Sequence, residues 1–228
     1  MAKKSFVVKM FNDIAPTYDK LNHILSLNID KGWRKKAVKE IVSHSPKQVL
    51  DIACGTGDFA IELAKAGVPN IYGADISEGM LEIGRKKIAE LGYNISLKVD
   101  DCESLSFEND SLDAISVAFG VRNFEHIPIG LKEMNRVLRP GGEVCVLELS
   151  VPLNPILRFG YKLYFLHILP FFGGLVSGNK EAYKYLPVSV LKFPKPDAFC
   201  QMMHEAGFHD VKVKAFTMGL CRMYTGFK

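Results

Sequence analysis

Short apolar runs alternate with amphipathic stretches through the middle of the chain. The runs have the length and aliphatic character of strands buried on both faces of a sheet, and they cover Gln48–Ile52, Asn70–Ala74, Ile95–Val99, Ala114–Ala118 and Glu143–Leu147. Apolar positions with a helical period separate the runs, over Asp58–Ala66, Gly79–Leu91 and Ile129–Leu138. Strands joined by single helices at this spacing predict right-handed βαβ units and a parallel sheet.

The pattern continues towards both ends of the chain. In Lys31–Val42 the apolar residues fall on one helical face and Lys and Arg on the other, which predicts an amphipathic helix. A helix near Asp197–Ala206 precedes two β-rich runs, Val211–Phe216 and Cys221–Phe227. The Pro-Gly-Gly at 140–142 predicts a turn that ends one helix and starts the fifth strand. We therefore expect an α/β fold with a mostly parallel seven-stranded sheet and helices on both faces.

The regular alternation stops after Ser150. The next segment, VPLNPILRFGYKLYFLHILPFFGGLVSGN, is rich in aromatic residues and irregular in its pattern. Its length suits an insertion that covers the ligand-binding edge of the sheet like a lid. Its most hydrophobic part, Ile168–Asn179, contains a proline and three glycines and is too short to cross a bilayer.

Composition narrows the classes of protein that remain. Hydrophobic residues make up 48% and charged residues 24% of the 228 residues, as in a globular domain. The net charge of +4 permits contact with an anionic surface but lacks the basic excess of a nucleic-acid-binding protein. The five cysteines show neither a CxxC pair nor zinc-ligand spacing, so we expect a reducing compartment and no metal site. Without an apolar leader at the N-terminus, the chain is expected to be soluble and cytoplasmic.

A glycine-rich turn follows the first apolar run. GTGDFA at 55–60 fits the pattern G-x-G-x-x-G/A at a strand-to-helix junction, where glycines let the backbone approach a ligand. On its own this pattern is typical of dinucleotide sites, and a turn that merely connects a strand to a helix also explains it. Asp75 ends the second run, in IYGAD, where a carboxylate accepts hydrogen bonds from two ribose hydroxyls; a surface turn acid is the alternative.

An acid inside the first apolar run distinguishes between two cofactors. Asp51 lies in VLDIACGTGD, directly before the turn, and Asp58 follows the turn. A carboxylate at this place repels the anionic pyrophosphate of NAD, whereas it attracts the cationic ammonium and sulfonium of S-adenosylmethionine. Asp51 and Asp58 therefore favour S-adenosylmethionine.

Three segments resemble class I S-adenosylmethionine-dependent methyltransferases: LDIACGTGD, GADIS and RVLRPGG. With these, further segments extend a resemblance to the ubiquinone/menaquinone biosynthesis C-methyltransferases over nearly the whole chain: MFNDIAPTYDKLNHILSLNIDKGWRKK (10–36), AFGVRN (118–123), RVLRPGGEVCVLELSVP (136–152), YLPVSV (185–190) and AGF (206–208). The resemblance implies a Rossmann-like fold and C-methylation of a prenylated quinol ring, with S-adenosylhomocysteine as the second product. Demethylmenaquinol is the favoured acceptor; the ubiquinone-pathway quinol and another small molecule remain alternatives.

The same resemblance assigns the cofactor site residue by residue. The matching positions are, in chain order, Asp51, Gly55, Thr56, Gly57, Asp75, Asp101 and Cys102. The acid at Asp101 is expected to accept the adenine amino hydrogen, although a helix cap explains it equally well. Two positions depart from the family pattern: Cys54 precedes the turn, where glycine is common, and Ala118 stands where a hydroxyl residue is sometimes used.

The acceptor side is assigned in the same way. The resemblance places Tyr18 and Asn22 over the quinol, and Arg122 with Asn123 at the edge where the methyl acceptor lies. Arg122 is expected to bind the quinol and, together with Asn123, to act in catalysis. A helix cap and an amphipathic helix start explain the first pair as structural residues, and a surface salt bridge explains Arg122.

Three other functions compete with methylation of a quinol. An NAD-dependent reductase conflicts with Asp51, and no convincing Tyr-x-x-x-Lys pair follows a middle strand. A methyltransferase acting on adenine in nucleic acid would carry an Asn/Asp-Pro-Pro-aromatic run after the fourth strand, where this chain has AFGVRN. A non-catalytic partner that binds the cofactor stays open.

The expected organisation is a single domain over 1–228. It consists of a helical cap at 1–45, a cofactor-binding core at 46–150, a substrate-side insertion at 151–195, and a closing helix with two strands at 196–228. The basic face of Lys31–Val42 and the aromatic segment Leu157–Val176 are expected to rest on the inner face of the membrane, although internal packing explains both equally well. No nucleic-acid partner is expected, and a homo-oligomer stays open.

Overall fold

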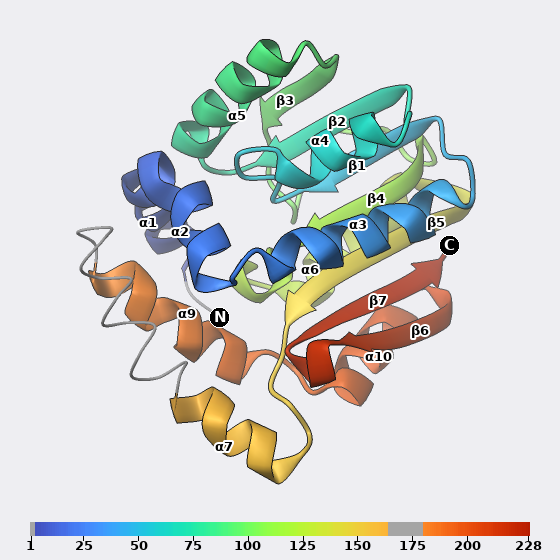
Figure 1. Ribbon diagram of the computed structural model, residues 1–228. Helices are drawn as coiled ribbons and strands as arrows, with labels where there is room; N and C mark the ends of the chain where they lie inside the picture. Colours follow the sequence, from blue (N-terminus) through green and yellow to red (C-terminus); the bar gives the residue numbers. More distant parts are fainter. Residues whose placement is uncertain (1–2, 164–179) are drawn as a thin grey trace.

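Seven strands form a single sheet in the computed structural model, which describes residues 3–163 and 180–228 (Figure 1). In chain order the strands are β1 Gln48–Ile52, β2 Asn70–Asp75, β3 Ile95–Val99, β4 Leu112–Ala118, β5 Leu138–Leu149, β6 His209–Phe216 and β7 Cys221–Phe227. Their order across the sheet is β3-β2-β1-β4-β5-β7-β6, and only the pairs that include β7 are antiparallel. The predicted mostly parallel sheet is confirmed.

Helices cover both faces of this sheet, as predicted (Figure 1). The helices that pack on it are α3 Ile29–Val42, α4 Asp58–Lys65, α5 Glu78–Leu91, α6 Ile127–Val137 and α10 Pro196–Glu205. On one face, α3 and α4 contribute Trp33 and Phe59 to a buried apolar cluster. On the other face, α6 and α10 contribute Met134 and Phe199 to a second cluster. The chain therefore buries the sheet on both sides, as its continuous apolar strands require.

Two further helices lie at the carboxyl ends of the parallel strands (Figure 1). They are α1 Lys4–Ile14 and α2 Tyr18–Leu25, which we call the N-terminal cap. The strand order reverses between β1 and β4, and ligands of such sheets bind outside the strand ends at that point. The N-terminal cap thus covers the place where a ligand is expected.

The start of β5 differs from the sequence prediction. Leu112 pairs with Leu138 and Ala114 pairs with Glu143, so β5 begins at Leu138 and residues 139–142 bulge out of the ladder. Gly141 adopts a φ of +77° in this bulge. The Pro-Gly-Gly therefore forms a bulge inside the strand and does not separate the strand from the preceding helix.

The insertion after Ser150 also differs from the expected irregular segment. It contains α7 Pro155–Leu163 and α9 Lys180–Lys192, while residues 164–179, with most of the aromatic stretch, lie outside the described residues. α9 packs on the N-terminal cap, where Val190 joins a buried cluster with Met10 and Leu21. Within residues 3–163 and 180–228, no helix has the length and apolar character needed to cross a membrane.

Candidate functional site

The backbone bends sharply after β1 to form the glycine turn, residues 53–57. Ala53, Gly55 and Gly57 have φ angles of +52°, +55° and +80°. Glycine adopts this left-handed region freely, whereas alanine pays on the order of 1 kcal/mol for it. Phe119, the first residue after β4, is also left-handed, at +59°. Strained residues on both sides of the strand-order reversal mark this edge as a functional site.

A cavity lies between the glycine turn, the ends of β2 and β4, and α1. It contains about 670 Å³ of space free of atoms, part of which is open to solvent. We call it the turn cavity. Its lining includes four of the predicted cofactor residues, namely Gly55, Asp75, Asp101 and Cys102.

Asp75 is held in place by the backbone around it. Its Oδ2 accepts the amide of Gly55 at 2.8 Å, and its Oδ1 accepts the amide of Ser77 at 2.9 Å. Burial raises the pKa of the Asp75 carboxyl, and these two amides oppose the rise by stabilising the anion. The carboxylate is therefore fixed at the cavity wall with lone pairs left for a ligand.

Asp101 and Cys102 line the turn cavity beneath α1. Lys4 of α1 donates to Asp101 Oδ2, and the amide of Glu103 donates to Oδ1 at 3.0 Å. Burial raises the pKa of the Cys102 thiol above its usual range, so this cysteine is a neutral packing residue. The N-terminal cap thus closes directly onto the acid that was predicted to face the adenine.

Asp51 lies under the glycine turn and does not line the turn cavity. Its side chain is buried, Ser116 Oγ donates to Oδ1 at 2.8 Å, and Oδ2 has no hydrogen-bond partner in the described part of the chain. Burial raises the pKa of this carboxyl to about 7, although the Ser116 hydrogen bond and the positive charge of Arg34 lower it. A buried acid with an unsatisfied oxygen is costly to fold around unless a cation comes close.

This raised pKa predicts an unusual dependence of stability on pH. The folded protein keeps the proton of Asp51 up to about pH 7, whereas the unfolded chain releases it near pH ~4. Stability from this group is therefore full below pH ~4 and is lost as the pH rises through 7. Asp51→Asn stays neutral, so its stability relative to wild type should rise by roughly 2 kcal/mol between pH 5 and pH 8.

Urea unfolding of the ligand-free protein at both pH values measures this change. Asp100→Asn is the matched control, because burial raises the pKa of Asp100 but hydrogen bonds from Ser106 and the charge of Lys98 lower it overall. Asp100 stays ionised between pH 5 and 8, so the effect of its substitution should be the same at both. If the effect of Asp51→Asn on the free energy of unfolding were also the same at pH 5 and pH 8, Asp51 would be ionised throughout this range.

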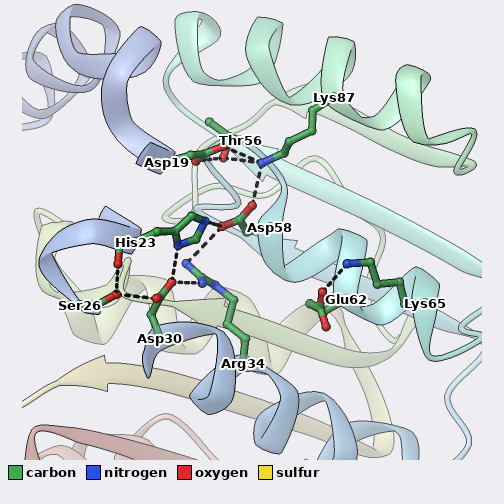
Figure 2. Close-up of polar contacts among 10 residues, drawn as sticks. All are labelled: Asp19, His23, Ser26, Asp30, Arg34, Thr56, Asp58, Glu62, Lys65 and Lys87. Atoms are coloured by element: carbon green, nitrogen blue, oxygen red, sulfur yellow. Dashed lines mark hydrogen bonds and ion pairs between the residues drawn. The ribbon is translucent and has the colours of Figure 1, made fainter. Parts of the chain in front are cut away.

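Thr56 and Asp58 point away from the turn cavity into a cluster of charged side chains (Figure 2). Thr56 Oγ1 donates to Asp19 Oδ1 at 2.6 Å, and Lys87 Nζ donates to Asp58 Oδ1 at 2.7 Å. Asp58 Oδ2 also lies 3.6 Å from Arg34 Nη2. Asp58 is therefore already paired with two cationic side chains, and it does not line the turn cavity.

The other residue of the glycine turn that was predicted to bind, Gly57, has a structural position. It precedes α4, its amide donates to Cys54 O at 2.9 Å, and it is absent from the lining of the turn cavity. A Cβ atom added at Gly57 would lie 3.2 Å from Ile88 of α5. Glycine is thus required here for the turn and for close helix packing.

A second, more apolar cavity adjoins the first beneath α2, α3 and α7. It contains about 1220 Å³ of space free of atoms, again partly open to solvent, and we call it the apolar cavity. Three predicted acceptor-side residues line it, namely Tyr18, Asn22 and Arg122. Tyr18 and Phe119 line both cavities. Two binding spaces therefore meet at these two rings.

Arg122 is buried beside a carboxylate that the sequence interpretation missed. Its Nη1 donates to Glu148 Oε1 at 2.7 Å and to the carbonyl of Phe119, and its backbone amide donates to Glu148 Oε2 at 3.1 Å. Glu148 is 0% exposed, so the pair is fully desolvated on the acid side. The surface salt bridge considered for Arg122 is wrong. Its Nε has no partner among the described residues, which leaves one buried donor free.

Tyrosines surround this guanidinium. Burial raises the pKa of Tyr18 and of Tyr185, while the charge of Arg122 lowers both, so the two phenols are neutral donors at physiological pH. Tyr185 Oη donates to Asn123 Oδ1 at 3.1 Å. This bond orients Asn123, which lines the turn cavity near Tyr18. The structure thus brings the four predicted acceptor-side residues together.

The described residues contain no group of three or more His, Cys, Asp or Glu side chains that could hold a metal ion.

Comparison with known proteins gives a family match over the whole chain. The model of the ubiE/COQ5 methyltransferase family matches residues 1–228. The demethylmenaquinone methyltransferase of Deinococcus radiodurans is 45% identical over 227 residues, covering 99% of this chain and 94% of that protein. The ubiquinone/menaquinone biosynthesis C-methyltransferase UbiE of Geobacter sulfurreducens is 45% identical over 223 residues, covering 96% and 87%.

Solved structures share the fold at lower sequence identity. A SAM-dependent methyltransferase from Thermotoga maritima matches with a TM-score of 0.70 and 19% identity, over 97% of this chain and 99% of that chain. A methyltransferase structure from Methanococcus maripaludis matches with a TM-score of 0.67 and 21% identity, over 100% and 96%. The predicted Rossmann-like methyltransferase fold is confirmed.

Proposed function

The chain belongs to the ubiE/COQ5 methyltransferase family, and we propose that it transfers a methyl group from S-adenosylmethionine to a ring carbon of a prenylated quinol. Demethylmenaquinol is the proposed acceptor, because relatives from Deinococcus radiodurans and Bacteroides fragilis are named demethylmenaquinone methyltransferase. The observation that carries the proposal is the meeting of an acid-lined cavity and an apolar cavity at Tyr18 and Phe119.

The residues of the turn cavity fit S-adenosylmethionine. Asp75 offers a fixed carboxylate for the two ribose hydroxyls, and Ile76, Met80 and Phe124 add apolar walls suited to the adenine. Asp51 has a buried oxygen without a hydrogen-bond partner among the described residues, and a cation bound nearby would favour the ionised form of this carboxyl. When bound, S-adenosylmethionine supplies an electrophilic methyl group.

The apolar cavity fits a flat ring that carries an apolar tail. Trp33, Phe119 and Leu186 line it, and so does Leu27, which is 79% exposed and therefore lies at its mouth. A mostly apolar cavity that opens at the surface suits a prenyl chain, whose outer part stays in a bilayer. A water-soluble acceptor of similar size would not need such a cavity.

Arg122 and Asn123 are proposed to act on the oxygens of the quinol ring. Methylation at carbon requires electron density, which rises when the neighbouring hydroxyl, with a pKa near ~10, loses its proton. Arg122 stays protonated, so it serves as a donor to the developing oxyanion and orients a water that accepts the hydroxyl proton. After methyl transfer the ring carbon loses its own hydrogen to water as a proton and the ring oxygen regains one, which restores the quinol. Asn123, oriented by Tyr185, is proposed to hold the other ring oxygen through its amide N–H.

Transfer of labelled methyl from S-adenosylmethionine to demethylmenaquinol and demethylubiquinol analogues, assayed in parallel, tests the function. We expect label on a ring carbon of the first analogue. Transfer to the second analogue alone would change the proposed acceptor, which the UbiE name of the Geobacter sulfurreducens relative keeps as the second candidate. Binding of S-adenosylmethionine without transfer to either would overturn the enzyme assignment in favour of a non-catalytic partner.

We also propose contact with a membrane surface, because the tail of this substrate resides in the bilayer. Ile156, Phe159 and Leu163 lie on one side of α7 and are 82%, 74% and 52% exposed. Such a stripe, together with the basic face of α3, suits the interface of an anionic bilayer. We expect more protein to float with phosphatidylglycerol vesicles than with phosphatidylcholine vesicles.

A double substitution in the apolar stripe on α7 distinguishes this contact from nonspecific adsorption to vesicles. Ile156→Gln with Phe159→Gln should reduce flotation with anionic vesicles, whereas Leu91→Gln should not, although Leu91 on α5 is 51% exposed. Equal flotation with neutral, anionic and no vesicles would remove the membrane contact from the proposal.

A further inference from the structure

Lys87 on α5 joins parts of the chain that are distant in sequence (Figure 2). Its Nζ donates to Asp19 Oδ2 at 2.8 Å, to Asp58 Oδ1 at 2.7 Å and to Thr56 Oγ1 at 3.1 Å. These four residues, which we call the Lys87 cluster, come from α2, the glycine turn, α4 and α5. One ammonium therefore fastens the N-terminal cap to the glycine turn.

The Lys87 cluster continues into α3. Asp58 Oδ2 lies 3.4 Å from His23 Nε2 and 3.6 Å from Arg34 Nη2, and Asp30 Oδ2 contacts both of these side chains. The side chains of Lys87 and Asp19 are 25% and 27% exposed, so water screens them less than a surface pair. An isolated exposed ion pair contributes little, but a partly buried network of this kind acts as a unit.

The position of Asp19 gives this network a consequence for both cavities. Asp19 directly follows Tyr18, which lines the turn cavity and the apolar cavity, and α1 adds Val7 and Phe11 to the wall of the turn cavity. Any shift of α2 away from the glycine turn therefore moves Tyr18 and opens both spaces.

We propose that Lys87 is a positioning residue, whose ammonium neutralises Asp19 and Asp58 and thereby seats α2 and Tyr18 between the donor and acceptor sites. The identity of the two ligands rests on the proposed function, whereas the role of Lys87 in holding the N-terminal cap in place does not. Without the ammonium, two carboxylates remain beside Thr56, whose single hydroxyl proton can satisfy only one of them. Arg34 still pairs with Asp58, but Asp19 then has no ion pair among the described residues. The unpaired charge of Asp19 and its repulsion from Asp58 drive α2 off the turn.

Lys87→Met removes the charge while keeping much of the side-chain volume. Lys86→Met is the matched control, because Lys86 is the neighbouring exposed lysine on the same helix. Hydrogen exchange of the α2 amides in the ligand-free protein should be about tenfold faster in Lys87→Met than in Lys86→Met, with exchange in β1 and β4 unchanged. Affinity for S-adenosylhomocysteine, measured by calorimetry, should fall by about tenfold in the same variant, because the cap walls that cavity.

A second substitution distinguishes a specific effect of the lost ammonium from a general loss of stability in Lys87→Met. Asp19→Asn in the Lys87→Met background removes the repulsion, so it should slow α2 exchange and restore part of the affinity. Equal α2 exchange in Lys87→Met and Lys86→Met would overturn the proposal, as would faster exchange with unchanged affinity. Absence of S-adenosylhomocysteine binding in the wild type would count against the proposed function, while the exchange comparison would still decide the role of Lys87.

Discussion

Arg122→Ala is expected to lower turnover of a saturating quinol analogue by roughly 10²–10³, as loss of one preorganised oxyanion donor typically does. The affinity for S-adenosylhomocysteine should hardly change, because Arg122 lines the apolar cavity and not the turn cavity. Arg122→Lys should recover only part of the rate, since a lysine ammonium lacks the planar fork of donors. Steady-state rates at several quinol concentrations, combined with calorimetry, separate the two effects.

The buried partner of Arg122 complicates the simple substitution. Removing the guanidinium leaves Glu148 with an unpaired buried charge, and breaking such a pair destabilises a protein by about 3–5 kcal/mol. The double variant Arg122→Met with Glu148→Gln removes both charges, while the glutamine carbonyl can still accept a backbone amide that Glu148 accepts now, so it should fold more nearly normally than Arg122→Ala. We expect it to remain as slow as Arg122→Ala.

Two outcomes decide the role of Arg122. A folded double variant with low turnover supports a donor role, because no buried charge is left to disturb the fold. Near-normal turnover of Arg122→Ala at saturating quinol would make the residue structural. In that case Tyr18, at the junction of the cavities, and Asp19 beside it are the next side chains to test.

The sheet could be predicted from the sequence because its central strands, such as β1 and β4, are buried on both faces. Continuous apolar runs and single intervening helices allow one arrangement, and the observed strands Gln48–Ile52 and Ile95–Val99 match the predicted ones. The insertion after Ser150 was predicted less well, because the apolar stripe of α7 faces solvent and Pro187 interrupts the pattern of α9. Those helices depend on context that a local pattern does not contain.

The candidate site was predictable where the position of a residue on a strand determines the direction of its side chain. Asp75 ends β2, and the structure places it in the turn cavity; Asp51 was identified because an acid is unusual in an apolar strand. The same signal occurs in VCVLELS, where Glu148 interrupts the apolar run of β5, and it would have revealed the partner of Arg122. Thr56 could not be placed in this way, because its partners Asp19 and Lys87 come from distant helices.

Asp75→Ala is expected to reduce the affinity for S-adenosylmethionine by about 10²-fold. The variant loses two charge-assisted hydrogen bonds to the ribose, each contributing on the order of 1.5–3 kcal/mol, and water compensates part of that loss. It also frees the amides of Gly55 and Ser77, so the glycine turn itself loses an anchor. Asp75→Asn separates the two contributions, because its remaining carbonyl oxygen can still accept one amide while the negative charge is gone.

Glu78→Ala provides the matched control for this prediction, and calorimetry with S-adenosylmethionine provides the measurement. Glu78 lies just after the same strand, and its substitution removes the same charge. Glu78 pairs with Arg85 at the surface, however, and does not line the turn cavity. Its affinity should stay within about twofold of wild type. We expect Asp75→Asn to bind more weakly than Glu78→Ala and more tightly than Asp75→Ala. If Asp75→Ala binds as tightly as Glu78→Ala, the ribose is held elsewhere, and the assignment of the turn cavity to the methyl donor fails.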